Sequence, residues 1–119
     1  MVLRGRLLMS EPEKPTGPCP CCAEVLESLA GSGVPEHIHN GIARWVSHGI
    51  DAGDFVMSLM EDRLVESFAR ADAANTESMR SIVAWLWGHC PAPARGRGVD
   101  AWRERGGSVG RTTPCGLVR

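Results

Sequence analysis

The sequence predicts an all-α protein: a compact bundle of about four short helices with disordered N- and C-terminal tails. Between residues 19 and 90, apolar residues recur every three to four positions, which is the helical period. No stretch of that region alternates with period two over a useful length, and no Asn-Gly or Asp-Gly pair joins two apolar runs. We therefore divide the 119 residues into a disordered segment 1–18, a helical domain 19–90 and an Arg/Gly/Pro-rich tail 91–119.

The first two helices are expected over residues 22–30 and 35–48. Gly31 and Gly33 end the first, Pro35 stands at a favoured first helical position of the second, and Gly49 ends the second. The apolar stripes that should face the core are Val25, Leu26 and Leu29 in the first helix, and Ile38, Ile42, Trp45 and Val46 in the second. The opposite side of the second helix carries three polar residues, His37, Arg44 and His48.

Two further helices are expected over residues 51–71 and 72–89. Asp51 is a suitable N-cap for one, Asp72 or Asn75 for the other, and Pro91 ends the last helix. The residues expected in the core are Phe55, Val56, Leu59, Met60, Leu64 and Phe68 in the third helix, and Met79, Ile82, Val83, Leu86 and Cys90 in the fourth. Trp85 and Trp87 lie off this stripe, which favours a role in association.

The net charge of −1 is unevenly distributed along the chain. Segment 1–18 carries +1, the helical domain −6 and the tail +4. A helical domain of 72 residues buries only about 60% of the surface that its unfolded chain exposes. We therefore expect either oligomerisation or a bound metal ion to help stabilise it.

The cysteines are the clearest candidates for a metal site. Cys19 and Cys22 form a C-x-x-C pair, the spacing that lets two thiolates bind one zinc ion, and Cys90 with His89, His37 or His39 could complete the set. The alternative is that all five cysteines are free thiols in a reducing compartment. The segment Gly17–Cys22 also resembles the opening of cysteine-rich CPCC zinc proteins, although it lacks their second C-x-x-C pair.

Several functions are disfavoured by what the sequence lacks. The nucleophile-elbow, zinc-protease and phosphate-loop motifs are absent, so we do not expect an enzyme. No apolar run reaches the roughly 20 residues of a membrane span, and the apolar block Leu7-Leu8-Met9 is too short for a signal peptide. The expected location is the cytoplasm, in a chain that starts naturally at Met1 or Met9.

Nucleic-acid binding by the helical domain is disfavoured because a helix carrying Asp51, Asp54 and Glu61 would repel phosphates. In the tail, Arg95-Gly96-Arg97-Gly98 and Arg105-Gly106-Gly107 resemble short RGG-type segments. The tail either contacts nucleic acid or serves as a solubilising segment.

Residues 34–91 resemble a group of small helical proteins from phages, prophages and mobile elements. The resemblance rests on Pro35-Glu36-His37, Trp45-Val46-x-His48-Gly49-Ile50, Gly53-Asp54-Phe55, Glu61-Asp62-x-Leu64, Arg70-Ala71-Asp72-x-x-Asn75 and Trp85-Leu86-Trp87. Asp51-Ala52 stands where the group has Pro-Pro. No catalytic residues follow from this resemblance.

The function expected from the sequence is therefore non-enzymatic. A homo-oligomer would bind a host protein or a small anionic signalling ligand of the host, including in a role against host defence. The candidate binding residues are Arg44, Trp45, His48, Arg70, Asp72, Asn75, Trp85 and Trp87, with Trp102 as a further apolar anchor. The alternative is a zinc-stabilised nucleic-acid-binding protein that uses Cys19, Cys22, His89 and Cys90 for the metal and the tail for nucleic acid.

Overall fold

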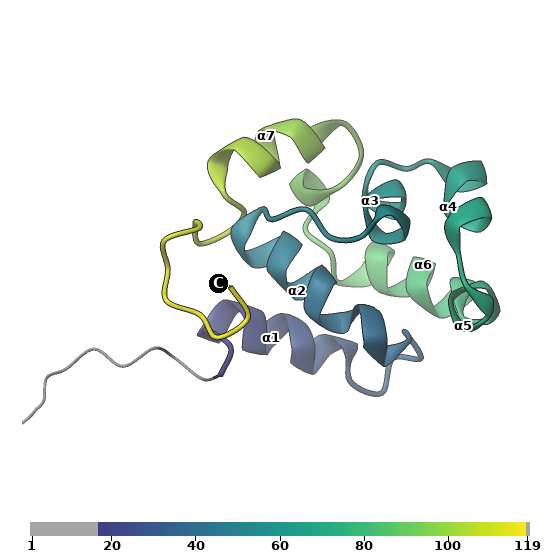
Figure 1. The fold of residues 1–119 in the computed structure, drawn as a ribbon, viewed down its shortest axis with the longest axis horizontal. Helices are drawn as coiled ribbons and strands as arrows, with labels where there is room; N and C mark the ends of the chain where they lie inside the picture. The colour runs from purple at the N-terminus through teal and green to yellow at the C-terminus, as the bar shows by residue number, and fades with distance from the viewer. Residues whose placement is uncertain (1–16, 119) are drawn as a thin grey trace, which may run out of the picture.

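The computed structural model describes residues 17–118, and within them the chain is all-helical (Figure 1). The predicted fold class is confirmed, but the expected number of about four helices is wrong, because this part of the chain forms seven. They are α1 (Pro20–Leu29), α2 (His39–His48), α3 (Asp54–Met60), α4 (Leu64–Arg70), α5 (Ala73–Glu77), α6 (Met79–Gly88) and α7 (Val99–Arg105). Three 3-10 helices, Glu36–Ile38, Ala92–Ala94 and Gly96–Gly98, lie between them. The expected disorder of segment 1–18 concerns residues that lie, apart from 17 and 18, outside the described range.

The two long predicted helices are each divided in two. Between α3 and α4, Asp62 adopts a left-handed conformation with φ of 59°, which no continuous helix tolerates. Between α5 and α6, Ser78 departs from helical geometry. Asp72 caps α5 through its side chain, which accepts a hydrogen bond of 2.7 Å from the Asn75 amide. Asp51 caps nothing; Gly53 precedes α3 instead.

The segment 91–118 folds onto the helical domain, which corrects the expectation of a disordered tail. Ala94, Val99 and Trp102 are buried in the main core. The indole of Trp45 donates to the carbonyl of Ala94 at 2.8 Å, and the indole of Trp102 donates to the carbonyl of Trp45 at 3.0 Å. A few large apolar residues thus anchor a segment whose overall composition is polar.

The core encloses most of the residues expected there, with exceptions on one side of the molecule. Leu64, Phe68 and Val83 were expected in the core, but each exposes 46% or more of its surface. Trp85 was expected at the surface, but it is buried, and its indole donates to the Ser28 hydroxyl of α1 at 2.9 Å. None of the helices in residues 17–118 has the length and apolarity that a bilayer span requires.

Candidate metal centre and polar pocket

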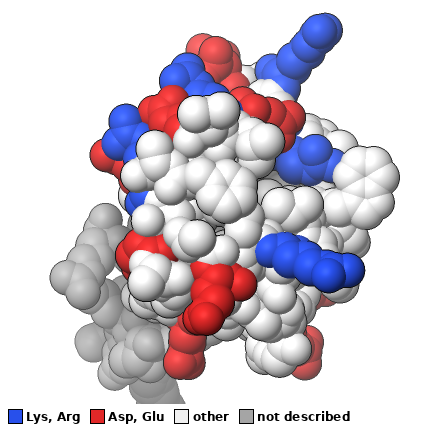
Figure 2. Space-filling view, turned by 90° about the vertical axis from the view of Figure 1, so that its right-hand side faces the viewer, with Lys and Arg blue, Asp and Glu red and all other residues white. Residues whose placement is uncertain are grey.

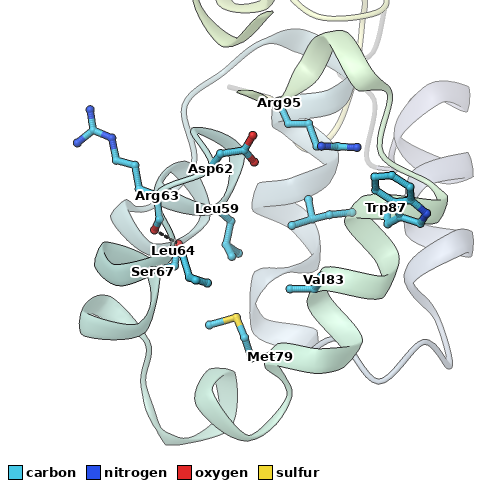
Figure 3. A pocket seen from close by; sticks show the side chains of 10 residues that line it. Leu59, Asp62, Arg63, Leu64, Ser67, Met79, Val83, Trp87 and Arg95 are labelled. Atoms are coloured by element: carbon cyan, nitrogen blue, oxygen red, sulfur yellow. Dashed lines mark hydrogen bonds between the residues drawn. The ribbon is translucent and has the colours of Figure 1, made fainter. Parts of the chain in front are cut away.

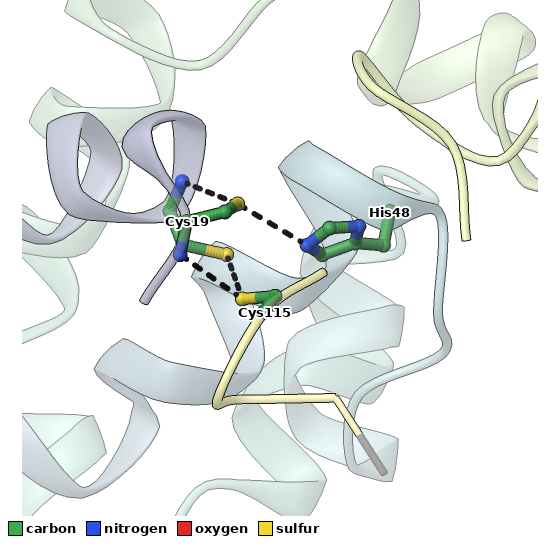
Figure 4. Close-up of side chains that lie close together, drawn as sticks. Cys19, His48 and Cys115 are labelled. Atoms are coloured by element: carbon green, nitrogen blue, oxygen red, sulfur yellow. Dashed lines mark hydrogen bonds between the residues drawn. The ribbon is translucent and has the colours of Figure 1, made fainter. Parts of the chain in front are cut away.

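A group of four buried side chains lies where α1, α2 and the C-terminal segment meet (Figure 4). The group, here called the Cys/His cluster, consists of Cys19, Cys22, His48 and Cys115, whose ligand atoms all lie within 4.8 Å of one another. Each of the four residues exposes 5% or less of its surface. Three thiols and an imidazole are a typical ligand set for a structural zinc ion.

The local fold of α1 places the two N-terminal cysteines on the same side. Cys19 is the N-cap of α1, and Pro20 follows at the first helical position. The Cys19 sulfur accepts a hydrogen bond of 3.5 Å from the amide of Cys22, one turn later. The C-x-x-C spacing at a helix start therefore brings both sulfurs to one point.

His48 reaches the cluster because the C-terminal segment packs against the end of α2. The amides of Ser108 and Val109 donate to the carbonyls of Val46 and Ser47 at 3.0 and 2.8 Å, which satisfies carbonyls that the helix end leaves free. The His48 ring then lies between two partners: Nδ1 is 2.6 Å from the carbonyl oxygen of Gly110, and Nε2 is 3.5 Å from the Cys19 sulfur. In the neutral imidazole that donates from Nδ1 to this carbonyl, Nε2 carries the lone pair that a metal ligand needs.

The spacing of the four ligand atoms fits a tetrahedral zinc ion. Zn–S bonds of about 2.3 Å and Zn–N bonds of about 2.0 Å give tetrahedron edges of about 3.8 Å between sulfurs and about 3.5 Å between sulfur and nitrogen. The sulfurs of Cys22 and Cys115 are 3.7 Å apart, and the Cys19 sulfur is 3.5 Å from His48 Nε2. Since no pair exceeds 4.8 Å, shifts of about 1 Å would close the remaining edges around an ion.

The pKa values of Cys22 and Cys115 are shifted in opposite directions. Burial raises the pKa of Cys22 to about 12. Burial also acts to raise the pKa of Cys115, but hydrogen bonds from the amides of Cys19 and Leu117 and from the side chains of His48 and Cys19 together outweigh it and lower the pKa to about 6. The Cys19 amide lies 3.2 Å from the Cys115 sulfur. The lowered pKa favours the thiolate form of Cys115, which is the form that binds a metal ion.

The metal residues expected from the sequence are only partly brought together. Cys19 and Cys22 lie in the cluster, whereas Cys90 and His89 do not: Cys90 is buried near Pro91, and His89 is exposed and stacked on Trp85. His48 and Cys115, instead of His89 and Cys90, complete the cluster. His48 was assigned to a solvated polar face but is fully buried. Cys115 was missed because its segment was expected to be disordered; an odd cysteine near the chain end was the only signal.

A second candidate site gathers four of the predicted binding residues. Arg44, Arg70, Asp72 and Asn75 line one pocket of about 550 Å³ between α2, α3 and α5. Arg70 is paired with Asp54 at 3.1 Å, and Asp72 with His37 at 3.1 Å.

Two groups in this pocket lack partners. Arg44 takes part in none of the ion pairs found within residues 17–118. Asn75 exposes only 3% of its surface, and its Oδ1 has no hydrogen-bond partner in that range. The structure therefore places one uncommitted cation and one under-satisfied amide on the same pocket.

The tryptophans expected as binding anchors are mostly structural. Trp45, Trp85 and Trp102 are buried, with every indole nitrogen bonded inside the protein. Trp87 is 81% exposed. Of the four, Trp87 alone is available to another molecule in the described part of the chain.

Neither a protein-family model nor a curated protein nor a solved structure matches this chain.

Proposed function

We propose that the protein is a non-enzymatic binding protein whose fold is closed by one structural zinc ion. Cys19, Cys22, His48 and Cys115 supply the ligands. The observation that carries this proposal is the convergence of four buried ligand atoms within 4.8 Å from three separate parts of the chain. A catalytic zinc keeps an open position for water or substrate, whereas four buried protein ligands fill the tetrahedron.

The zinc ion would join three parts of the chain that are far apart in the sequence. Cys19 and Cys22 belong to the start of α1, His48 ends α2, and Cys115 lies 67 residues further along the chain. Around the cluster pack only small or partly buried apolar residues, separate from the main core. A metal ion compensates for so small an apolar cluster, because its binding free energy adds directly to folding.

The test measures metal content and stability in the same samples. Protein purified under reducing conditions should contain one zinc per chain by elemental mass spectrometry, and Cys22→Ser or Cys115→Ser should lose it. Cys21→Ser is the matched control, because Cys21 is adjacent to Cys22 and outside the cluster. Cobalt substitution should give the visible absorption of a tetrahedral thiolate site.

Chelation of the metal should lower the unfolding temperature. Extraction by a strong chelator should reduce Tm by at least about 10 °C, since structural zinc contributes several kcal/mol in small domains. Re-addition of zinc should restore it. A wild-type protein that folds without metal and has the same Tm before and after chelation would contradict the proposal, as would a disulfide between Cys22 and Cys115 found by mass spectrometry.

The proposed ligand is a small anion in the pocket lined by Arg44 and Asn75. Arg44 would bind the anionic group, and the side-chain amide of Asn75 would form a hydrogen bond with a neighbouring polar group of the ligand. The resemblance to phage and mobile-element proteins makes a host signalling molecule the first class to test. Titration with inorganic phosphate and with adenosine monophosphate, followed by NMR, should shift the backbone amide resonances of residues around Arg44. Arg44→Ala should abolish these shifts and Arg80→Ala, an exposed arginine outside the pocket, should not.

The alternative function, nucleic-acid binding through the arginine-rich segment, receives less support from the structure. Arg103 pairs with Asp51 at 2.6 Å and with Asp100 at 3.0 Å. Arg105 lies 4.9 Å from the centre of the Trp102 ring, and Arg111 donates to the backbone carbonyls of Gly49 and Arg103. These side chains stabilise the fold, so fewer cations remain for phosphates. Salt-dependent binding of single-stranded DNA that Arg97→Ala weakens would favour this alternative.

A further inference from the structure

The side of the molecule formed by α4 and α6 exposes the apolar residues that a helix normally buries. In α4, Leu64 is 64% exposed, Val65 84% and Phe68 46%, while Ser67 is the one buried residue. In α6, Val83 is 49% and Trp87 81% exposed. Figure 2 looks onto this side of the molecule and shows an uncharged central area with charges of both signs around it. We call these five apolar residues the α4–α6 face.

The face is hollowed, and a ridge lies beside the hollow. A pocket of about 320 Å³ separates α4 from α6, and Leu59, Leu64, Met79 and Val83 point into it (Figure 3). Val65, which is not among its lining residues, protrudes next to it on the outer side of α4. The left-handed turn at Asp62 produces this arrangement, because it directs α4 away from α6 after α3 ends.

Two unpaired charges of opposite sign stand on the rim of the pocket. Asp62 and Arg95 both line it, and neither takes part in an ion pair found within residues 17–118. The Nε of Arg95 is buried without a hydrogen-bond partner, and its guanidinium lies 5.8 Å from the centre of the Trp87 ring. Arg63, by contrast, is fully engaged with Glu61 and Glu66.

We propose that the α4–α6 face binds a second copy of this chain in a two-fold symmetric dimer. In such an interface one surface must complement itself, so a hollow needs an adjacent ridge and each charge needs its opposite on the same patch. The face has both features: the Val65 ridge fits the partner's hollow, and Asp62 of one copy meets Arg95 of the other. Beside the face, the arginines Arg63 and Arg70 are paired with Glu61 and Glu66, so apart from Arg95 the face lacks the free positive charge that nucleic acid or an anionic membrane would need.

The exposed apolar residues of the face supply much of the contact area that a stable pair needs. A large aromatic residue alone buries about 150–250 Å² on contact. Five exposed apolar residues, one of them a tryptophan that is 81% exposed, together with their polar rim, approach the roughly 800 Å² per partner of a standard interface.

Sedimentation equilibrium over a hundredfold range of protein concentration tests the proposal. It is carried out with a reducing agent, because Cys21 is partly exposed and could join two chains by a disulfide. The wild type should sediment as a dimer. Val65→Glu should raise the dissociation constant by at least about tenfold, since it places a charge in an apolar contact. Arg95→Gln and Asp62→Asn should each weaken the dimer, and asparagine keeps the left-handed conformation at position 62 accessible.

The matched control is Val109→Glu, which puts the same charge on an apolar residue that is 41% exposed and outside the face. It should dimerise as the wild type does. Circular dichroism and zinc content should be unchanged in Val65→Glu, so that loss of the dimer is distinguished from loss of the fold or of the metal. A wild type that is monomeric at every concentration, or an oligomer of any size that Val65→Glu leaves unchanged, would overturn the proposal.

Discussion

At the scale of single residues, two glycines let the C-terminal segment approach α2. Gly49 and Gly107 both have positive φ, at 65° and 75°. A Cβ on Gly107 would lie 2.5 Å from the Gly49 amide nitrogen and 2.6 Å from that of His48. This backbone contact holds His48 beside Gly110 and therefore positions the imidazole of the Cys/His cluster.

Gly107→Ala should consequently be far more destabilising than the same change at Gly110. Gly110 also has a positive φ, 89°, but an added Cβ would meet nothing within 4 Å. Gly110→Ala should cost about 1–2 kcal/mol from backbone strain alone. Gly107→Ala adds a clash with backbone atoms that cannot move aside, so about 3 kcal/mol or more is expected. Urea unfolding of both variants measures the difference; equal losses would contradict the packing described.

Residue patterns reveal local geometry well and distant partners poorly. Cys19 and Cys22 could be predicted to lie together because their three-residue spacing at a helix start brings both sulfurs close without help from the rest of the fold. His48 and Cys115 join them through tertiary contacts of the segment after α7. Periodicity placed His48 on a polar face, since no pattern within α2 indicates that another segment covers it.

At the scale of helices, hydrogen bonds from buried indoles attach one element to another. Trp85 links α6 to α1 through the Ser28 hydroxyl, which itself donates to the carbonyl of Val25 at 2.7 Å. Trp45 links α2 to the segment before α7 through the Ala94 carbonyl. Helical periodicity placed Trp45 in the core, as the structure does, although it was also considered as a binding residue. Trp85 was assigned to partner binding because it lies off the apolar stripe of its helix, and periodicity within one helix does not reveal that α1 covers it.

Trp85→Phe should separate the structural role of Trp85 from the exposed position of Trp87. Loss of the hydrogen bond to Ser28 and of part of the ring should cost about 2 kcal/mol of unfolding free energy. Trp87→Phe should change it by no more than about 0.5 kcal/mol, because Trp87 is 81% exposed. Unfolding is measured at low protein concentration to limit the effect of association. A larger loss for Trp87→Phe than for Trp85→Phe would contradict this assignment.

The division of the predicted long helices also belongs to this scale. Hydrophobic periodicity runs through residues 51–71 without interruption, but Asp62 breaks the helix with a left-handed turn. Aspartate adopts this conformation more readily than most residues, yet it does so rarely enough that its presence in a sequence does not predict a break. The break turns the apolar residues of α4 outward, which is why Leu64 and Phe68 were misplaced in the core.

At the scale of the whole molecule, the chain cannot be reduced to the acidic helical domain that its composition suggests. Residues 91–118 contribute Ala94, Val99 and Trp102 to the core and Cys115 to the Cys/His cluster. Within residues 17–118, Arg103 is the arginine of this segment that pairs with carboxylates of the helical domain, Asp51 at 2.6 Å and Glu61 at 4.0 Å. Burial of apolar side chains, more than charge, therefore attaches the segment to the domain.

Deletion of residues 91–119 should therefore unfold the protein. Were the segment a disordered tail, the remaining helical domain would keep its helicity and its cooperative thermal transition. In the structure, the deletion leaves the indole nitrogen of the buried Trp45 without its acceptor, removes Trp102 from the core and takes Cys115 from the Cys/His cluster. The helical circular-dichroism signal at 222 nm should weaken. The amide resonances in the NMR spectrum should fall in the narrow chemical-shift range of an unfolded chain. Cys115→Ser, which removes only one thiol of the Cys/His cluster, should retain more helicity than the deletion. A truncated chain that melts cooperatively at the wild-type temperature would instead support a disordered tail.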